Sequence, residues 1–357
     1  MEYFIFISFF ATFTLINLYL KDNAVIKIIY YFLILLVAFF IGLRGIEDEY
    51  TRLYVRVPSL MSFFSQLDPV GVEKGYLFAL ICSILKTFGC SSQSLLLVFA
   101  LTSVTIHAVY YRKFTKYYIL AFLVYMSHEM YFHEWSGIRM GLASALILPM
   151  IYCLVNEKKK SFYCLLLISI FIQYVAILSI ILNWLRNKIK TKYLVLGLIL
   201  SVIISYSGFF KESMLFFSNL GLLPKIIQGY VHWDVYSYDI GIFHLKTFQQ
   251  IIVLTFSIYV THRFHEHPSP YFNLIFNTYY ISTILFIVFS DIAIFATRIA
   301  AHFYVVEPIM LAYLARFFVQ KKLYSVIVIN GAIIIAAINY ILRPRLPSYN
   351  MFLINPF

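Results

Sequence analysis

Arginine and acidic side chains gather in a short stretch that follows an apolar run, and their chemistry suits a phosphate-bearing ligand. The stretch GLRGIEDEYTRLYVR, residues 42–56, contains Arg44, Asp48 and Arg52. A guanidinium group stays ionised and pairs in a bidentate way with phosphate oxygens, so several together suit a pyrophosphate. A carboxylate such as that of Asp48 can take a proton from a hydroxyl group. The stretch therefore combines groups for holding an anion with groups for general base chemistry.

A second stretch with similar chemistry, residues 127–145, reads SHEMYFHEWSGIRMGLASA. His133, Glu134 and Trp135 come before Arg139, which lies near the predicted start of a helix. The positive end of a helix dipole favours anions, so Arg139 adds its charge to a natural anion site. The small residues that follow allow close packing, or a close approach of a ligand to the backbone.

A third stretch, residues 290–308, reads SDIAIFATRIAAHFYVVEP. Arg298 and His302 are four residues apart and so share a helix face. Glu307 stands just before Pro308 inside an apolar span. A carboxylate at membrane depth is costly, so we interpret Glu307 as functional.

The segment 210–246 alternates aromatic, histidine and aspartate residues in YVHWDVYSYD, which includes Trp233. Aromatic faces suit stacking on sugar rings. An amphipathic lid at the membrane interface, where Trp and Tyr are common, is an equally good and compatible interpretation. The histidine-rich segment 261–268 is better explained as a polar turn ended by prolines than as a metal site.

The candidate residues fall into three roles. The candidate catalytic bases are Asp48, His133 and Glu134. The candidate pyrophosphate ligands are Arg44, Arg52, Arg139 and Arg298. The candidate glycan-binding residues are Tyr54, Glu73, Trp135, Trp233, His302 and Glu307. The alternative for Arg44 and Arg298 is that they are helix-end residues that snorkel to the membrane surface, or that they are partners of Glu47 and Asp291. We expect no metal and no other cofactor, because there is no DxD-type pair, P-loop, GxSxG or GxGxxG sequence.

The composition predicts an all-α, polytopic integral membrane protein that would position these residues. The 357 residues are 62% hydrophobic and only 12% charged, with a mean hydropathy of +0.84, whereas soluble domains are about half apolar and a quarter charged. Apolar runs long enough to cross a bilayer as helices recur along the chain, and the short alternating segments of a β-barrel do not. We predict one transmembrane domain, residues 1–357, with about 11–12 transmembrane helices, an outer loop with an interfacial helix at 44–91 and a long outer loop at 210–246. The predicted spans are 3–20, 28–43, 92–111, 117–130, 137–155, 161–172, 174–185, 193–209, 247–262, 271–289, 298–318 and 323–341.

The apolar segment 161–185 is predicted to form a short helical hairpin. Lysine-rich clusters lie at both of its ends, which places both ends in the cytoplasm. About 24 apolar residues would then form two half-length helices that meet near Gln173 and Tyr174. A single straight helix would instead reverse the side of everything downstream.

With the hairpin accepted, lysine and arginine separate to opposite sides of the membrane. About twelve of the seventeen lysines, but only about four of the eleven arginines, fall on the side of the basic loops, which is the cytoplasm. The remaining arginines lie on the outer side, against the usual bias. We interpret this outer set as a site for an anionic group at the membrane surface.

The order of these motifs resembles that of the EpsG/Wzy-type polysaccharide polymerases. The resemblance rests on an arginine after the second span, the pair Asp48 and Tyr54, the run VEKGY at residues 72–76, the run GIRMGLA at residues 137–143, and the lysine-rich turn before a helical hairpin. It extends in order over about residues 40–185. This chain has Glu-Asp-Glu-Tyr where the family often has Gly-Thr-Asp-Tyr, so Asp48 or Glu49 could match the family's acid. It also has Gln173 where the family often has a histidine at the hairpin turn.

The resemblance implies a GT-C-like polymerase of the bacterial inner membrane with its active site facing the periplasm. It would join lipid-linked oligosaccharide repeat units, with the glycan on undecaprenyl pyrophosphate as donor and a second lipid-linked unit as acceptor. It also implies a polysaccharide chain-length regulator as partner, and no nucleic acid. Two alternatives share the same arginines: an O-antigen ligase-like glycosyltransferase, and a flippase for lipid-linked oligosaccharides, although no internal repeat favours the transporter.

Overall fold

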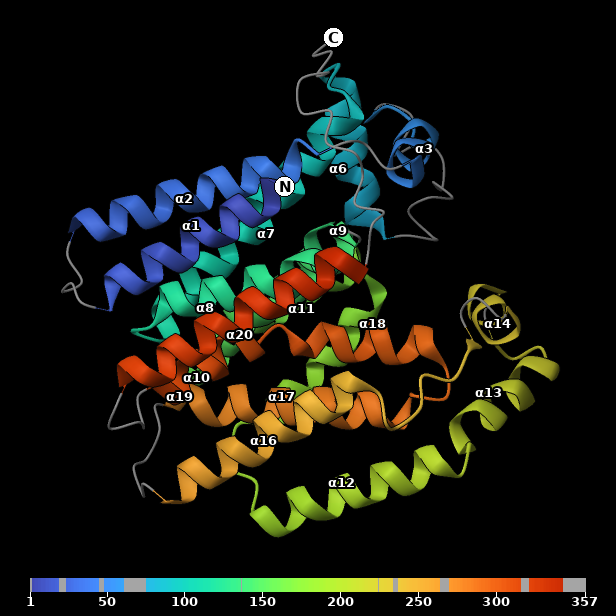
Figure 1. Ribbon diagram of the computed structural model, residues 1–357. Coiled ribbons are helices and arrows are strands. Elements are labelled where there is room, and N and C mark those ends of the chain that lie inside the picture. Colours follow the sequence, from blue (N-terminus) through green and yellow to red (C-terminus); the bar gives the residue numbers. More distant parts are fainter. Residues whose placement is uncertain are drawn as a thin grey trace. The chain divides into compact units, whose positions relative to one another are not determined.

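The computed structural model describes residues 2–18, 24–44, 48–60, 75–135, 137–223, 225–233, 237–263, 270–315 and 321–342. Within these ranges the regular structure is entirely helical (Figure 1). Among the described residues, four helices are long and apolar enough to cross a membrane, or six if each of two bent pairs counts as one span. Further apolar helices of 10–17 described residues are present, so within the described ranges fewer than the predicted 11–12 helices reach full spanning length. The chain is an all-α, polytopic membrane protein.

The chain packs as two compact units. Unit 1 consists of Met1–Leu178 and Leu311–Phe357, and unit 2 consists of Ser179–Met310. The helices that lie within unit 1 are α1 (Glu2–Asn17), α2 (Ala24–Gly42), α3 (Asp48–Arg56), α6 (Tyr76–Thr87), α7 (Ser92–Phe114), α8 (Tyr118–Val124), the π-helices η1 (Tyr125–Glu129) and η2 (Tyr131–Trp135), α9 (Ile138–Ala145), α10 (Ile147–Val155), α11 (Lys159–Ile172) and α20 (Lys321–Leu342).

Helices α2 and α7 form a closely packed antiparallel pair. The Tyr30 hydroxyl donates to the Ala108 carbonyl (3.2 Å) near one end, and the Gln93 side-chain amide donates to the Gly42 carbonyl (2.6 Å) near the other. A Cβ on Gly42 would lie only 2.7 Å from the Leu97 Cα, so this contact needs glycine. The outward face of α2 exposes large apolar side chains, as a lipid-facing helix should.

The basic loops of unit 1 gather at one end of it. Arg112 donates a hydrogen bond to the Tyr31 hydroxyl (3.1 Å). The ammonium groups of Lys113 and Lys158 both lie over the ring of Tyr152, at 4.5 and 5.9 Å from its centroid. The loops 111–116 and 156–160 therefore share one end, and the starts of α7 and α9 lie at the other. This agrees with the sidedness that the sequence predicts for these loops.

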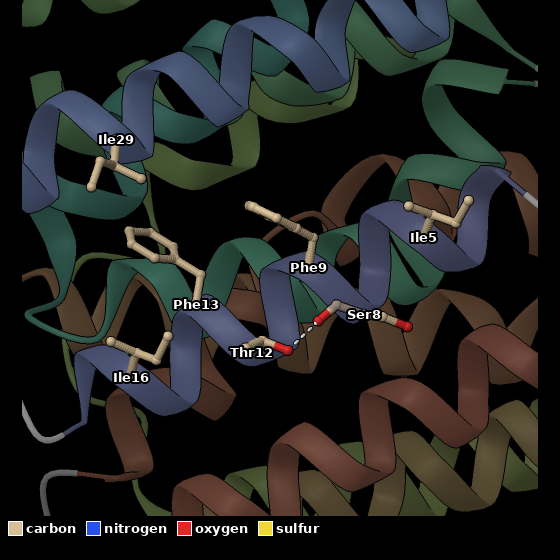
Figure 2. A pocket seen from close by; sticks show the side chains of 7 residues that line it. All are labelled: Ile5, Ser8, Phe9, Thr12, Phe13, Ile16 and Ile29. Atoms are coloured by element: carbon tan, nitrogen blue, oxygen red, sulfur yellow. Dashed lines mark hydrogen bonds between the residues drawn. The ribbon is translucent and has the colours of Figure 1, made fainter.

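Helix α1 carries an open apolar groove on its outer face. The groove has a volume of about 670 Å³, and Figure 2 shows the seven side chains that line it, six from α1 and Ile29 from α2. Its polar members are Ser8 and Thr12, and the Thr12 hydroxyl donates to the Ser8 carbonyl (2.8 Å). With five of its seven side chains apolar and the Thr12 hydroxyl satisfied, the groove presents a surface suited to acyl chains.

The predicted break in the segment 161–185 is present. Helix α11 ends at Ile172, Gln173 has an extended backbone (φ −151°, ψ 118°), and a 3-10 helix, η3 (Tyr174–Asn183), begins at the next residue. The chain turns here against the start of α6. A Cβ on Gly75, whose φ is +117°, would lie 2.6 Å from the carbonyl oxygen of Ile172, so glycine is required on both grounds.

Unit 2 contains α12 (Thr191–Tyr206), α13 (Phe209–Asn219), α14 (Lys225–His232), α16 (Leu245–Arg263), α17 (Pro270–Val288) and α18 (Ala293–Tyr304). Helices α12 and α17 run in the same direction, because Tyr280 bonds to the Leu194 carbonyl (2.9 Å) and the hydroxyls of Ser205 and Ser290 lie 2.6 Å apart. Helix α18 packs antiparallel to α17 (Figure 1).

Two bends in the chain follow from local sequence. Helices α12 and α13 meet at 54° across Gly208, which has a φ of +63°. Helix α18 and α19 (Glu307–Leu314) meet at 49°, directly before Pro308. Proline removes a backbone donor and clashes with the preceding turn, so it ends the helix there. The predicted span 298–318 is therefore bent, and the bend lies just before Glu307 and Pro308.

Two segments predicted wholly or partly as loops are largely helical. Residues 125–135, which run from the predicted span 117–130 into the loop after it, form the π-helices η1 and η2 and continue α8 into the interior of unit 1. The segment 210–246 forms α13, α14 and the start of α16. Polar residues in both segments suggest loops, but packing against neighbouring apolar helices stabilises helical structure regardless of composition.

Candidate functional site

Arg44 is a buried connector between two segments of unit 1. Its side chain is 0% exposed, with Nη1 donating to the Ile41 carbonyl (3.0 Å) and Nη2 to the Trp135 carbonyl (2.8 Å). Gln93 donates to the carbonyls of Gly42 (2.6 Å) and Arg44 (2.9 Å). These contacts satisfy carbonyls that the end of α2 would otherwise leave without partners. Arg44 thus links the end of α2 to the end of η2 by hydrogen bonds.

Helix α3 is fixed against this end of unit 1 by two tyrosines. The Tyr50 hydroxyl accepts the backbone N–H of Ile138 (3.1 Å), the first residue of α9. The Tyr54 hydroxyl donates to the Cys90 carbonyl (2.6 Å), and burial raises the pKa of Tyr54 above its ordinary value. Tyr54, a candidate for glycan binding, is 6% exposed and is used in this packing contact. Arg52 points to solvent from the same helix.

Arg139 is a half-buried arginine in the first turn of α9. Its guanidinium lies over the ring of Phe78, 5.3 Å from the centroid. It also lies within electrostatic reach of Tyr174, which in turn interacts with Tyr76. The arginine is therefore surrounded by aromatic groups from α6 and the start of η3. A half-buried guanidinium at a helix N-terminus is suited to a phosphate group.

Glu134 is a buried carboxylate held on one oxygen. Its Oε1 accepts the Ser103 hydroxyl (2.6 Å) and the Tyr125 hydroxyl (3.0 Å). The side chain is 1% exposed. Its Oε2 has no hydrogen-bond partner and faces Gly141, where a Cβ would lie 2.9 Å from it. The absence of a side chain at Gly141 therefore makes room for this carboxylate.

His133 is paired with Glu129, a residue that the sequence did not single out. His133 Nε2 lies 2.8 Å from Glu129 Oε2, and the two side chains are 2% and 3% exposed. Nδ1 of His133 has no hydrogen-bond partner. A carboxylate beside one ring nitrogen fixes the tautomer and leaves the other nitrogen able to accept a proton. The one indication of Glu129 in the sequence is that a carboxylate stands among the apolar and aromatic residues of SHEMYFHEW.

The π-helical geometry of residues 125–135 places the side chains of Tyr125 and Glu134 on the same face. In an α-helix, residues nine positions apart point to opposite sides, because each residue turns the chain by about 100°. A π-helix has about 4.4 residues per turn, so nine residues complete about two turns. Tyr125 can therefore bond to Glu134. Single π turns are frequent at functional sites.

Trp135 is buried and belongs to the packing of unit 1. It is 2% exposed, lies parallel to the ring of Tyr131 (6.2 Å between centroids) and meets Phe40 edge-on (5.8 Å). Its position in this structure is that of an aromatic core residue, with no face open to a sugar.

In unit 2, Glu307 lies in a small buried network. Its Oε1 accepts the Gln249 side-chain amide (2.9 Å), and its Oε2 accepts the Tyr279 hydroxyl (2.5 Å). Gln249 also donates to the Tyr304 hydroxyl (2.9 Å), and the Lys246 ammonium lies 3.9 Å from the centroid of the Tyr304 ring. The carboxylate sits at the helix break before Pro308 and connects α16, α17 and α19.

The other candidates in unit 2 have separate surroundings. Arg298 is exposed and donates to the Tyr230 hydroxyl of α14 (3.0 Å), whereas His302, one turn further on, is 0% exposed with Nε2 2.7 Å from the Ser179 hydroxyl. Trp233 is 62% exposed. The two residues on α18 therefore do not share a ligand position in this structure.

Asp291, the alternative partner of Arg298, accepts a hydrogen bond from the first turn of α13. Its Oδ2 accepts the backbone N–H of Lys211 (2.8 Å), in the first turn of that helix. A carboxylate at this position complements the helix dipole. Burial nevertheless raises the pKa of Asp291 above its ordinary value.

The structure brings Arg44, His133, Glu134, Trp135 and Arg139 together within unit 1, and α3 with Arg52 and Tyr54 packs beside them. Asp48 is the first residue of α3, but its side chain lies outside the described part of the chain, as do Glu73 and the side chains of the histidine-rich segment 261–268. Ser103, His107 and Tyr111, four apart on α7, are buried polar residues that the sequence analysis missed. Their spacing of four residues within the predicted span 92–111 indicates that they share one face of the helix.

Comparisons with known proteins agree with the predicted resemblance. The chain matches the model of the EpsG family over residues 27–354. It is 24% identical over 247 residues to the amylovoran biosynthesis protein AmsC of Erwinia amylovora, which covers 66% of this chain. The chain spans less than two thirds (64%) of the length of AmsC, and no solved structure matches it. Since the family match covers nearly the whole chain, the protein belongs to the EpsG family.

Proposed function

We propose that this protein is a polymerase that joins oligosaccharide repeat units carried on undecaprenyl pyrophosphate. The observation that carries the proposal is the division of charge in unit 1, where Lys113 and Lys158 share one end and Arg44, Arg52 and Arg139 gather at the other. Membership of the EpsG family supports it, as does the name of the relative AmsC, which refers to amylovoran biosynthesis.

The pyrophosphate of the donor would bind at the start of α9. Arg139 combines a permanent charge with the positive end of a helix dipole, and it is only half-buried. Arg52, exposed on the neighbouring helix α3, supplies a second guanidinium. Arg44 would support the site from the interior, because its N–H groups hold the end of α2 to Trp135. In unit 2, Arg298 is open to solvent and is the further candidate for an anion.

The reaction is the transfer of a glycan to a hydroxyl. The terminal sugar hydroxyl of the acceptor attacks the anomeric carbon of the donor, the carbon–oxygen bond to the pyrophosphate breaks, and undecaprenyl pyrophosphate leaves as an anion. Cations placed where this negative charge develops lower the barrier. The energy comes from the phosphate-linked donor, so the reaction needs no nucleotide.

The hydroxyl proton must pass to a base, and the candidates differ in access. Asp48 begins α3 at the arginine-bearing end. His133 and Glu134 are almost fully buried, so either would receive the proton through intervening groups or after a movement of η2. Each has one unpartnered acceptor atom, Nδ1 and Oε2 respectively, which is the position a base needs.

The glycan would contact exposed aromatic and polar groups. Trp233 is the candidate in unit 2 whose ring is open to solvent, as stacking on a sugar requires. Tyr54, Trp135, His302 and Glu307 would act as supports, since each is buried with protein partners. Glu73, in the outer loop, remains a candidate for hydroxyl contacts.

The arginine-bearing end of unit 1 would face the periplasm of a bacterial inner membrane. The lysine-rich loops would then lie in the cytoplasm, as the positive-inside rule requires. A polysaccharide chain-length regulator is the expected partner protein, and the lipid-linked glycans are the substrates.

The test uses purified protein, lipid-linked repeat units and no nucleotide, and follows the product by gel electrophoresis. The parent should give a ladder of lengthening glycans, and Arg139→Lys should abolish it, because an ammonium cannot pair with a phosphate in a bidentate way. Arg112→Lys, at the opposite end of unit 1, is the matched control and should keep the ladder. If no ladder forms and the lipid instead changes leaflets in liposomes, the protein is a transporter and the proposal is wrong.

A further inference from the structure

A row of polar side chains runs along the inner face of α7. Ser103, His107 and Tyr111 are four residues apart and each is 0% exposed. Residues four apart lie one above another on a helix. The row therefore extends from the middle of this span to its last turn, which carries Arg112.

A second polar row faces it from the helical stretch 125–135. The Ser103 hydroxyl bonds to Glu134 (2.6 Å), and the ring of His107 stacks on that of Tyr125 (4.2 Å between centroids). Tyr111 lies within electrostatic reach of both Glu129 and Glu134. The rings of His107 and Tyr111 are 5.5 Å apart. The two rows form one continuous polar seam inside unit 1.

The seam contains polar atoms that have no protein partner. These buried atoms are His107 Nε2, Tyr111 OH, Glu129 Oε1, His133 Nδ1 and Glu134 Oε2. An unsatisfied buried polar group is unfavourable, and native proteins keep few of them unless water or a ligand is present. Their gathering in one place indicates that the seam holds something that can donate and accept hydrogen bonds. Ordered water satisfies this requirement, since each molecule can bridge several polar groups.

A metal site and a purely structural network both account for the seam less well. Among the residues that the structure describes, no three His, Cys, Asp or Glu side chains are placed to hold a metal ion. A network with a purely structural role should have its bonds satisfied, as the Glu307 network in unit 2 does. Ionisable residues inside membrane spans are costly, and chains of Glu and His residues there serve as proton relays.

We propose that this seam conducts protons along unit 1, between the end that carries Arg139 and the end that carries Arg112. A proton enters at Glu134 and His133, passes through water and His107 to Tyr111, and leaves at the last turn of α7. The Ser103 carbonyl holds Nδ1 of His107 (2.9 Å), so His107 takes up a proton at Nε2 and releases it there to the next water, and no other bond changes. In glycosyl transfer the seam would take up the single proton lost by the acceptor hydroxyl, a link that rests on the proposed function.

The experiment measures proton flux through the full-length protein in liposomes without any glycan. A pH-sensitive dye inside the vesicles reports the flux driven by a potassium gradient and valinomycin. Tyr111→Phe removes one oxygen atom, and His107→Phe removes both ring nitrogens while keeping the stacking on Tyr125. Each should lower the flux about tenfold. Thr105→Ala, on the exposed face of the same helix, should leave the flux unchanged.

The proposal is wrong if the parent conducts no faster than protein-free vesicles, or if both phenylalanine variants conduct as fast as the parent. The variants are compared at equal circular dichroism signal and equal elution volume. Tyr111→Phe keeps the ring and its packing contacts. A lower flux in this variant can therefore be attributed to the lost hydroxyl and not to misfolding. Because no lipid-linked sugar is present, the outcome is independent of whether the chain is a polymerase.

Discussion

Gly141 is the position where the described structure gives the sharpest stability prediction. It lies inside α9, directly against the end of η2. A Cβ added there would lie 2.6 Å from the carbonyl oxygen of His133 and 2.9 Å from Glu134 Oε2. Real Cβ atoms do not approach backbone this closely, and the His133 carbonyl belongs to a helix that is itself tightly packed. Gly141→Ala must therefore push η2 away from α9.

The size of the effect follows from two opposing contributions. Overpacking of a well-packed interior costs about 1–3 kcal/mol. Alanine in place of glycine inside a helix returns about 0.5–1 kcal/mol. Gly331, inside α20, has nothing within 4 Å of its Cβ position, so Gly331→Ala has only the second contribution. The helix-propensity gain is common to both variants, and they should differ by about 1–3 kcal/mol.

The assay is unfolding of the purified proteins by titration with sodium dodecyl sulfate in mixed micelles. Gly141→Ala should have a lower free energy of unfolding than the parent, and Gly331→Ala an equal or slightly higher one. The displaced Glu134 should also loosen from Ser103 and Tyr125, so polymer formation should fall in Gly141→Ala alone. If Gly141→Ala is as stable as Gly331→Ala, the inference that η2 packs too closely on α9 to admit a Cβ is wrong.

Two further predictions concern Tyr54 in unit 1 and Asp291 in unit 2. Tyr54→Phe loses the hydrogen bond to the Cys90 carbonyl and should lower the free energy of unfolding by about 1 kcal/mol, whereas Tyr206→Phe, at an 88% exposed position, should have no effect in the same titration. Asp291 has a folded-state pKa raised by burial, so its ionisation destabilises the folded protein as the pH rises through that pKa. Asp291→Asn should therefore unfold at a higher temperature than the parent at neutral pH, and the difference should shrink in acid; a difference that grows in acid would contradict this.

Much of the helix arrangement could be predicted from the sequence, because length, apolar runs and helix breakers act locally. The break at Gln173 followed from lysine clusters on both sides of an apolar run too short for two full spans. The break before Pro308 followed from the missing backbone donor of proline. The grouping of basic loops at one end of unit 1 followed from the bias of lysine toward one side of the membrane.

The positions of side chains could not be predicted in the same way. The sequence indicates that Arg44 and Trp135 lie near the membrane surface, but not that the Arg44 guanidinium donates to the Trp135 carbonyl. Residues 127–135 read as a loop because they are polar, although π-helical turns bury them against α7. That register, and with it the role of Glu129, depends on tertiary packing.

The contacts of Arg44 explain why an arginine stands at this end of unit 1. One planar group donates to the Ile41 carbonyl, in the last turn of α2, and to the Trp135 carbonyl at the end of η2, which the single ammonium of a lysine could not do in the same geometry. Arg139 follows Trp135 by four residues, so the half-buried guanidinium and the buried side chains of Glu134 and His133 lie close together in the sequence. A ligand that draws Arg139 outward would pull on the segment that carries those groups. Under the proposed function, anion binding at Arg139 and proton uptake at Glu134 and His133 would occur within a few residues of each other, as suits a reaction that releases one proton for each anion formed.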